Sequence, residues 1–312
     1  MVKVKVIFLG TSGGIPTLYR NLPSVALINE GNVILFDCGE FTQIQLIKSS
    51  IKLGRIDKIF ISHLHGDHVT GLPGLLMLLN HASREKPLHI YGPAGLKNYI
   101  FSTKKILNFY LGYHIYVNEI CAGETINGDG YKIITFPLEH TTFTLGFSYI
   151  EDEKPGKLDI DKTRALGVPE GPLLKRLKNG EDIKLEDGRT VFSADVVGPP
   201  VEGRKIVYAV DTRPTDSVVE NSIGADLLIH DGMFLKDIED EAAKRGHCTA
   251  ESAANIAKKA EVKRLILTHI SPRYVSGKPL AEEAKAVFEN TFVAYDLLEV
   301  EIERKKAQLP GK

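Results

Sequence analysis

The chain has 312 residues, of which 43% are hydrophobic and 25% are charged, so it can bury a substantial core and is not extensively disordered. Its formal net charge of −1 excludes a globally basic surface, so any contact with nucleic acid has to come from local basic patches. Three cysteines without a CxxC pair argue against a disulfide framework and favour a reducing, cytoplasmic setting.

The first part of the chain predicts short strands that lead to one dense polar cluster. Residues 2–9 alternate like a β-strand and lack the apolar core and cleavage site of a signal peptide. No apolar stretch is long enough to span a membrane. Further strands are predicted at 24–29, 33–37 and 58–61, and a helix at 41–51.

The cluster directly after residues 58–61 consists of metal-ligand residue types. His63, His65, Asp67 and His68 all fall within six positions. Imidazole nitrogen and carboxylate oxygen are the usual ligands of zinc and similar ions. Histidines two apart in an extended segment project to the same side, so His63 and His65 can hold one ion. Asp67 and His68 follow a turn and can reach a second ion.

The remaining sequence alternates predicted strands and helices, as expected for an α/β protein. Strands are predicted at 87–92, 114–120, 131–136, 142–151, 191–195, 206–210, 226–229, 264–267 and 293–294. Helices are predicted at 75–79, 94–106, 249–260 and 281–289. The segment 152–188 interrupts this pattern, because it is rich in charge, glycine and proline and shows no clear strand.

Four of the apolar runs end in a ligand-type residue, namely His63, His140, Asp211 and His269. A site built at the carboxyl ends of strands produces this pattern. Seven such residues suit two metal ions about 4 Å apart that clamp a phosphoryl group. One ion would be held by His63, His65 and His140, the other by Asp67, His68 and His269, with Asp211 bridging, although sequence alone does not assign ligands to ions.

The HLHGDH motif at 63–68, together with the later His, Asp and His, resembles the metallo-β-lactamase superfamily. Further stretches resemble its tRNA 3′-processing endonuclease family, called tRNase Z or ribonuclease Z, in the short form. These stretches are FLGTSGGIPTLYRNLPS near the start, FDCGE at 36–40, HGDHVTGLPGLL, AVDTRP at 209–214, HCTAESAA at 247–254 and THISPRY at 268–274. They extend over essentially the whole chain.

The resemblance implies an α/β fold, a four-layer αββα sandwich forming one domain over 1–312, in a homodimer. It implies two Zn²⁺ ions per chain, or Mn²⁺ or another divalent ion, and a precursor tRNA as substrate. Asp67 is implied to orient or deprotonate the attacking water. His247 is implied as the proton donor to the leaving 3′-oxygen. In the family this histidine is supported by a glutamate, and the matching residue here is Asp231, which is one methylene shorter.

Two loops are implied as substrate contacts. The early loop matches the family pattern at Pro16, Arg20 and Asn21, whereas Leu18 stands where the family has lysine. That loop is associated with sensing the CCA sequence at the tRNA end. Arg273, in the THISPRY stretch, is a further expected substrate contact.

The insertion between His140 and Asp211, which are 71 positions apart, helps to distinguish between the candidate functions. Residues 154–178 carry seven basic and three acidic side chains, a local charge of +4, and predict a projecting arm within about 152–188. Its Gly-Pro centre resembles the family's tRNA-binding arm. The arm residues expected to contact tRNA are Lys154, Lys157, Gly167, Pro169, Gly171, Pro172, Lys175 and Arg176.

Three functions stay open on these observations. The first is an endonuclease that removes the 3′ trailer of precursor tRNA and leaves a 3′-hydroxyl and a 5′-phosphate. The second is a small-molecule hydrolase, such as a thioesterase, arylsulfatase or cyclic phosphodiesterase, which the basic arm disfavours. The third is a non-catalytic RNA-binding module, which the complete ligand set disfavours.

Overall fold

The computed structural model describes residues 3–310, which form two compact units. The first unit, here called the body, contains the chain up to Gly128, Lys132–Tyr149 and Lys205–Ile302. The second, here called the arm unit, contains Asp129–Tyr131, Ile150–Arg204 and the segment that begins at Glu303.

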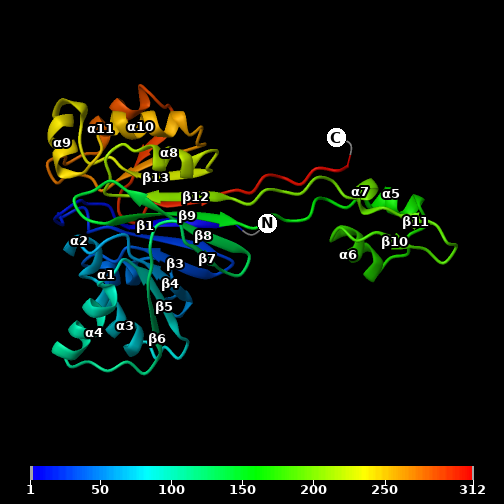
Figure 1. Ribbon diagram of the computed structural model, residues 1–312, viewed down its shortest axis with the longest axis horizontal. Coiled ribbons are helices and arrows are strands. Elements are labelled where there is room, and N and C mark those ends of the chain that lie inside the picture. Colours follow the sequence, from blue (N-terminus) through cyan, green and yellow to red (C-terminus); the bar gives the residue numbers. More distant parts are fainter. Residues whose placement is uncertain (1–2, 311–312) are drawn as a thin grey trace. The chain divides into compact units, whose positions relative to one another are not determined.

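The body is built on two mixed seven-stranded sheets (Figure 1). The first sheet has the strand order β16-β1-β2-β3-β4-β5-β6, antiparallel from β16 to β3 and parallel from β3 to β6. Its strands are β1 (Val4–Gly10), β2 (Ser24–Asn29), β3 (Asn32–Phe36), β4 (Ile56–Phe60), β5 (Leu88–Gly92), β6 (Ile115–Glu119) and β16 (Glu299–Ile302).

The second sheet has the order β15-β14-β13-β12-β9-β8-β7, in which β12 to β15 are parallel. Its strands are β7 (Thr125–Asn127), β8 (Tyr131–Leu138), β9 (Thr144–Glu151), β12 (Lys205–Ala209), β13 (Leu227–Asp231), β14 (Leu265–Thr268) and β15 (Thr291–Val293). The parallel strands β12, β13 and β14 are almost fully buried, which explains why they were visible in the sequence as continuous apolar runs.

Helices cover the outer face of each sheet (Figure 1). On the first sheet lie α1 (Thr42–Lys48), α2 (Gly66–Val69), α3 (Leu72–His81) and α4 (Leu96–Ile106), with the 3₁₀ turn η1 (Leu53–Arg55). With the second sheet lie α8 (Asp216–Ser222), α9 (Glu239–Arg245), α10 (Ala250–Lys259) and α11 (Lys278–Lys285), with the 3₁₀ turn η2 (Lys236–Ile238). Helix α10 begins as the sequence predicts, because the Thr249 side chain accepts a hydrogen bond from Ser252 N.

The two sheets pack face to face through aromatic side chains. Phe36 of β3 stacks on Tyr208 of β12 with ring centres 5.4 Å apart, and Phe60 of β4 meets Phe147 of β9 at 5.4 Å. Separate apolar clusters fill the space between each sheet and its helices. The body therefore has the layers helix, sheet, sheet, helix, and the predicted α/β class is confirmed.

The final strand was predicted wrongly. The sequence placed it at 293–294, but 291–293 form β15 and the last strand is β16, which pairs with the N-terminal strand in the register Val4↔Ile302. Strand β16 has only four residues in a polar segment, so its alternation was too short to recognise. Of the described helices, none is long and apolar enough to cross a bilayer.

The arm unit is folded, although its sequence showed no regular pattern. It contains α5 (Ile160–Ala165), α6 (Pro172–Lys178), the strand pair β10 (Ile183–Lys184) and β11 (Thr190–Val191), and α7 (Ser193–Val196). Five buried residues form its small core, namely Val168, Leu177, Ile183, Val191 and Val196. The unit is thus wider than the 152–188 segment expected from the sequence, and it includes the chain's last described residues.

Candidate metal centre and catalytic site

The seven ligand-type residues lie in the body and follow the carboxyl ends of its strands. His63 comes after β4, His140 after β8, Asp211 after β12 and His269 after β14. The other three are supplied by α2 and the residue before it, since His65 is the N-cap of this short helix and Asp67 and His68 lie within it. The strands therefore bring residues more than 200 positions apart to one place.

The structure gathers these residues, here called the His–Asp centre, into two groups that share Asp211, and a third group joins Asp211 and His269 to Asp231 and His247. The first group is His63, His65, His140 and Asp211, and the second is Asp67, His68, Asp211 and His269. In each group the potential ligand atoms lie within 4.8 Å of one another. These groups have the same members as the two sets suggested from the sequence, with Asp211 common to both.

In the first group, ring nitrogens face one another. His63 Nε2 lies 3.0 Å from His65 Nδ1, and His140 Nε2 lies 3.2 Å from the same atom. Asp211 Oδ2 lies 3.5 Å from His63 Nε2 and 3.6 Å from His140 Nε2. Ligand atoms about 2.0–2.1 Å from a tetrahedral zinc are roughly 3.3 Å from each other, so this spacing fits one ion.

The second group has the same spacing. His68 Nε2 lies 3.3 Å from Asp211 Oδ2 and 3.5 Å from Asp67 Oδ2, and His269 Nε2 lies 3.3 Å from Asp67 Oδ2. His68 Nε2 is fully buried without a hydrogen-bond partner among the described residues. Asp211 Oδ1 also lacks one there, although it lies 2.9 Å from His269 Nε2. Buried polar atoms are normally satisfied, so this set of buried donor atoms suits a bound cation.

In three of the histidines a contact to Nδ1 holds the ring, so that Nε2 faces the centre. His63 Nδ1 lies 2.9 Å from Ser62 Oγ, His68 Nδ1 lies 2.7 Å from Asp37 Oδ2, and His140 Nδ1 lies 2.8 Å from Gly246 O. Partners of this kind set the tautomer and orientation of metal-binding histidines.

The electrostatics of the centre also suit a cation. Burial lowers the pKa of His63 well below its ordinary value and lowers that of His140, so both rings keep the lone pairs that a metal needs. Burial alone would lower the pKa of His269, but the Asp211 carboxylate outweighs it and raises this pKa to about 10. The second group therefore holds an excess proton, and a divalent ion would supply the positive charge in its place.

His247 and Asp231 adjoin this centre. His247 Nδ1 lies 2.8 Å from Asp231 Oδ2, and the His247 ring centre is 5.2 Å from that of His269. The other oxygen of Asp231 accepts Met233 N at 2.9 Å, so the carboxylate is fixed at both ends. Asp231 is fully buried at the end of β13, and its shorter side chain still reaches His247.

Sequence reasoning missed four residues that support the centre. Asp37 is fully buried and accepts hydrogen bonds from Ser62 N at 2.7 Å, Ser62 Oγ at 2.9 Å and Tyr208 Oη at 2.7 Å, besides its contact with His68. Gly14 N donates to Asp67 Oδ2 at 2.9 Å. Asp37 could have been found by the signal used for Asp211, since it directly follows the apolar run of β3.

The early loop is held by hydrogen bonds to the segment after β15. Arg20 Nη1 donates to Ala294 O at 2.6 Å and to Thr11 Oγ1 at 2.8 Å. Asn21 donates through both its backbone N and its Nδ2 to Asp296 Oδ2 at 2.7 Å. These contacts position the loop and leave Leu18, which is 94% exposed, at its tip.

The other expected substrate contacts are exposed. Arg273 stacks over the Phe234 ring with its guanidinium carbon 4.9 Å from the ring centre. The eight arm residues lie in the arm unit, and their side chains or backbone face solvent. Gly167 and Gly171 both have positive φ, 82° and 137°, which the turns between α5 and α6 require.

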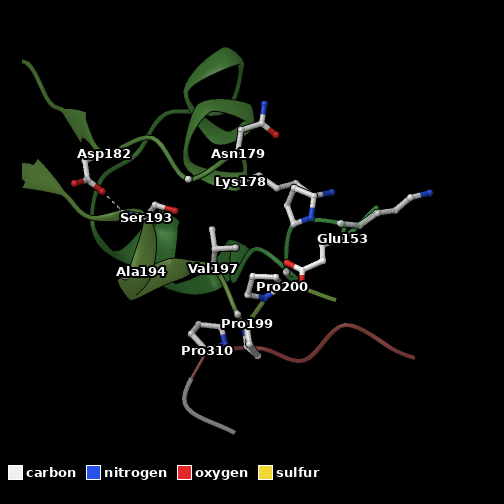
Figure 2. Close-up of a pocket in the computed structure, with 15 residues that line it drawn as sticks. Glu153, Lys178, Asn179, Asp182, Ser193, Ala194, Val197, Pro199, Pro200 and Pro310 are labelled. Carbon is white, nitrogen blue, oxygen red and sulfur yellow. Dashed lines mark hydrogen bonds between the residues drawn. The ribbon is translucent and has the colours of Figure 1, made fainter. Parts of the chain in front are cut away.

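The arm unit also has a hollow of about 770 Å³ (Figure 2). Prolines 199, 200 and 310 form part of its wall, and Lys178 and Asn179 at the end of α6 form another part. It contains none of the seven ligand-type residues.

Known proteins resemble this chain along nearly its full length. A ribonuclease Z from Methanosarcina acetivorans is 43% identical over 301 residues, which cover 96% of this chain and 98% of that protein. A ribonuclease Z from Bacillus licheniformis is 42% identical over 306 residues, covering 96% and 100%. The crystal structure of human tRNase Z, short form, superimposes with a TM-score of 0.70 at 30% identity and covers 95% of this chain and 98% of that one.

Two family models match parts of the chain. The model of the beta-lactamase superfamily domain matches residues 177–270, and that of the anti-Pycsar protein Apyc1 matches residues 4–108. The metallo-beta-lactamase fold protein YhfI from Bacillus subtilis has a TM-score of 0.70 at 20% identity, which shows a shared fold only.

Proposed function

The chain belongs to the ribonuclease Z family of the metallo-β-lactamase superfamily and is a tRNA 3′-processing endoribonuclease, and from this premise we propose that it cuts with two metal ions held by the His–Asp centre. The observation that supports two ions is the pair of four-residue groups that share Asp211. The products are a tRNA with a 3′-hydroxyl and a trailer with a 5′-phosphate.

The residues fit zinc, since five imidazoles and two carboxylates are its ordinary ligands, and Mn²⁺ or another divalent ion is an alternative. Two bound ions would provide a nucleophile at neutral pH and stabilise the charge that develops on the phosphate. Elemental analysis after saturation with metal should give about two ions per chain. A ratio that stays at one would contradict the two-ion scheme.

We assign the orientation of the attacking water to Asp67. Burial opposes ionisation of Asp67, but the hydrogen bond from His269 outweighs it, so its pKa is lowered and it is a carboxylate at neutral pH. Gly14 N holds the same oxygen that faces His269. Its carboxylate is therefore fixed in position before substrate binds.

We assign the proton donor to His247. Asp231 is a carboxylate that can only accept, so the Nδ1 proton of His247 points to it and Nε2 is the atom free to deliver a proton to the leaving 3′-oxygen. Asp231 would also stabilise the protonated ring. A general acid of this kind typically contributes about 10²–10⁴-fold to the rate.

We propose that the arm unit, an insertion in a single metallo-β-lactamase domain, binds the body of the tRNA and performs no chemistry. Basic side chains at its surface, among them Lys157 and Lys175, would contact phosphates, and the early loop and Arg273 would contact RNA nearer the cut. Replacing residues 154–178 with a short Gly-Ser loop should raise KM for precursor tRNA and flatten the salt dependence of binding. An unchanged KM for precursor tRNA in this variant would favour the alternative function of a small-molecule hydrolase.

We propose a homodimer that uses the outer face of α1. Phe41, Ile44 and Ile47 are 42%, 43% and 62% exposed there, an apolar patch that a monomer would leave in water. The cytoplasmic location stays a prediction from composition.

One assay tests the whole function. Purified protein is incubated with a 3′-extended tRNA, and the ends of both products are mapped. Cleavage at the 3′ side of the acceptor stem with the stated end groups is expected. Hydrolysis of small esters without any cleavage of precursor tRNA would overturn it.

A further inference from the structure

Apart from Arg20 of the early loop, the residues of an aromatic and basic groove beside that loop have no role in the site described above. A hollow of about 470 Å³ is lined by the aromatic residues Tyr19, Phe292 and Tyr295 and by the basic residues Arg20, Lys278 and Lys285. A second hollow of about 220 Å³ shares Tyr19, Arg20 and Val275 with it, so the two form one groove, here called the α11 groove.

The groove is built on the two loops that touch the His–Asp centre. Its smaller hollow includes Pro272, three residues after His269. On the other wall, the early loop runs from Gly14, which donates to Asp67, to Tyr19 and Arg20. Gly13 N also donates to Ile270 O at 3.1 Å, which ties the two loops together next to the centre. Both walls of the groove therefore continue, within a few residues along the chain, into the loops that carry Gly14 and His269.

The charge of the groove differs from that of the whole protein. Three of its lining residues are basic and none is acidic, although the chain has a net charge of −1. Lys285 Nζ lies 5.5 Å from the centre of the Phe292 ring, so its charge is held at the groove wall by a cation–π contact. Lys278 has only a loose contact with Glu282 at 3.7 Å, and its side chain is 78% exposed.

The aromatic rings of the groove are open to solvent. Tyr19 is 75% exposed, Tyr295 59% and Phe292 47%. Exposed rings beside cations form the usual platform for single-stranded nucleic acid, in which bases stack on the rings and phosphates meet the cations. A duplex hides the faces of its bases, so the acceptor stem does not fit this surface.

We infer that the α11 groove is a binding site for the single-stranded 3′ trailer, in which unpaired bases stack on Tyr19 and Tyr295 and phosphates contact Lys278 and Lys285. This inference rests on the proposed endonuclease function and adds a determinant of substrate choice. Long trailers reach the groove, whereas a trailer of one nucleotide ends near the cut. The enzyme should therefore prefer longer trailers.

The test uses the full-length, metal-loaded enzyme and precursor tRNAs whose trailers have one, three, six and ten nucleotides. In the wild type, kcat/KM should rise with trailer length and then level off. Tyr295→Ala should lower kcat/KM for the ten-nucleotide trailer on the order of tenfold and leave the one-nucleotide trailer unaffected. The double variant Lys278→Ala/Lys285→Ala should reduce the salt slope of binding by about 0.7 per lost phosphate contact, again only for long trailers.

Matched controls separate the groove from general effects. Lys258→Ala/Lys259→Ala removes two exposed lysines from α10, and Tyr110→Ala removes a ring that is 79% exposed outside the groove. Both controls should behave as the wild type. A 4-thiouridine placed within the trailer should crosslink to peptides that contain Tyr19 or Tyr295.

Equal losses for all trailer lengths, or losses matched by the controls, would overturn the inference, as would crosslinks that map elsewhere. A wild-type enzyme that cuts precursor tRNA at the expected position without any dependence on trailer length would refute the groove alone. Absence of cleavage in the wild type would refute the proposed function itself.

Discussion

The buried ion pair of Glu151 and Arg204 in the arm unit gives a prediction that distinguishes RNA binding from catalysis. Glu151 accepts hydrogen bonds from Arg204 Nε and Nη2, both at 2.7 Å, and lies 3.1 Å from Arg304 Nη2. Arg204 is only 2% exposed and Glu151 4%. The cluster therefore joins the two ends of the segment Ile150–Arg204 to the tail after β16.

Glu151→Ala would remove the buried carboxylate that the guanidinium groups of Arg204 and Arg304 share. Removing one partner of a buried pair typically costs about 3–5 kcal/mol, because the remaining charge stays desolvated. The substitution should therefore unfold or loosen the arm unit, raise KM for precursor tRNA and leave hydrolysis of a small activated phosphodiester near the wild-type rate. Arg189→Ala is the matched control, since its pair with Asp187 is exposed and such pairs contribute little.

Hydrogen exchange measured by mass spectrometry locates the effect. Peptides from 150–204 should lose protection in Glu151→Ala, whereas peptides from β12 to β14 should keep it. Unchanged exchange in 150–204 would refute the reasoning about the ion pair. Equal loss in both units would show a global effect and refute the separation of arm from body.

The same cluster should respond to acid. Burial alone would raise the pKa of Glu151, but the hydrogen bonds from Arg204 outweigh it and hold the pKa below its ordinary value. Its stabilisation is therefore complete above the unfolded pKa of about 4.3 and is lost as the pH falls through the lower folded pKa. Protection of 150–204 should decline in that acid range in the wild type, and this component should be absent from Glu151→Gln.

Four further predictions concern the body. His247→Ala should slow cleavage of precursor tRNA about 10²–10⁴-fold at normal metal content, and should slow a nitrophenyl ester less, because that leaving group needs no proton; equal losses in kinetic assays would count against the donor role. Asp37→Ala should weaken metal binding about 10–100-fold in competition with a chelating indicator, and unchanged affinity would show that the His68 contact is dispensable. Chelation should lower the melting temperature by calorimetry, because the grouped ligands lose their shared cation; an unchanged value would argue against resident ions. Ile47→Glu should shift sedimentation to the monomer, and a persisting dimer would exclude the α1 face.

Four of the seven ligand-type residues could be read from the sequence because each follows a strand, and the other three stand in the dense cluster after the first of these strands. A continuous apolar run that stops before Asp211 or His269 marks both a strand and its end, and the half-buried strand β8 ends shortly before His140. The carboxyl ends of parallel strands meet at one edge of a sheet, so linear order was enough to predict that these residues meet. The predicted α/β class followed from the same runs.

The supporting contacts were not readable in this way. Tyr208 and Asp37 are 171 positions apart and meet only because the two sheets pack face to face. Gly14 acts through its backbone N, which no side-chain pattern reveals. The arm unit was missed as folded structure because its core contains only a few apolar side chains at irregular intervals.

Backbone geometry adds a second requirement at the strand ends. Asp37, Asp211 and His269 have φ values of 58°, 60° and 59°, in the left-handed region that most residues avoid. Aspartate and histidine tolerate this region better than most side chains, and they are also metal ligands or acceptors. Glycine would relieve the backbone strain but would remove the functional atom. A β-branched residue would neither relieve the strain nor supply a carboxylate or imidazole. The chain turns sharply at each of these positions, and this turn directs the side chain at the strand end toward the centre. The residue type at each position is therefore set jointly by the backbone conformation and by the chemistry of the side chain.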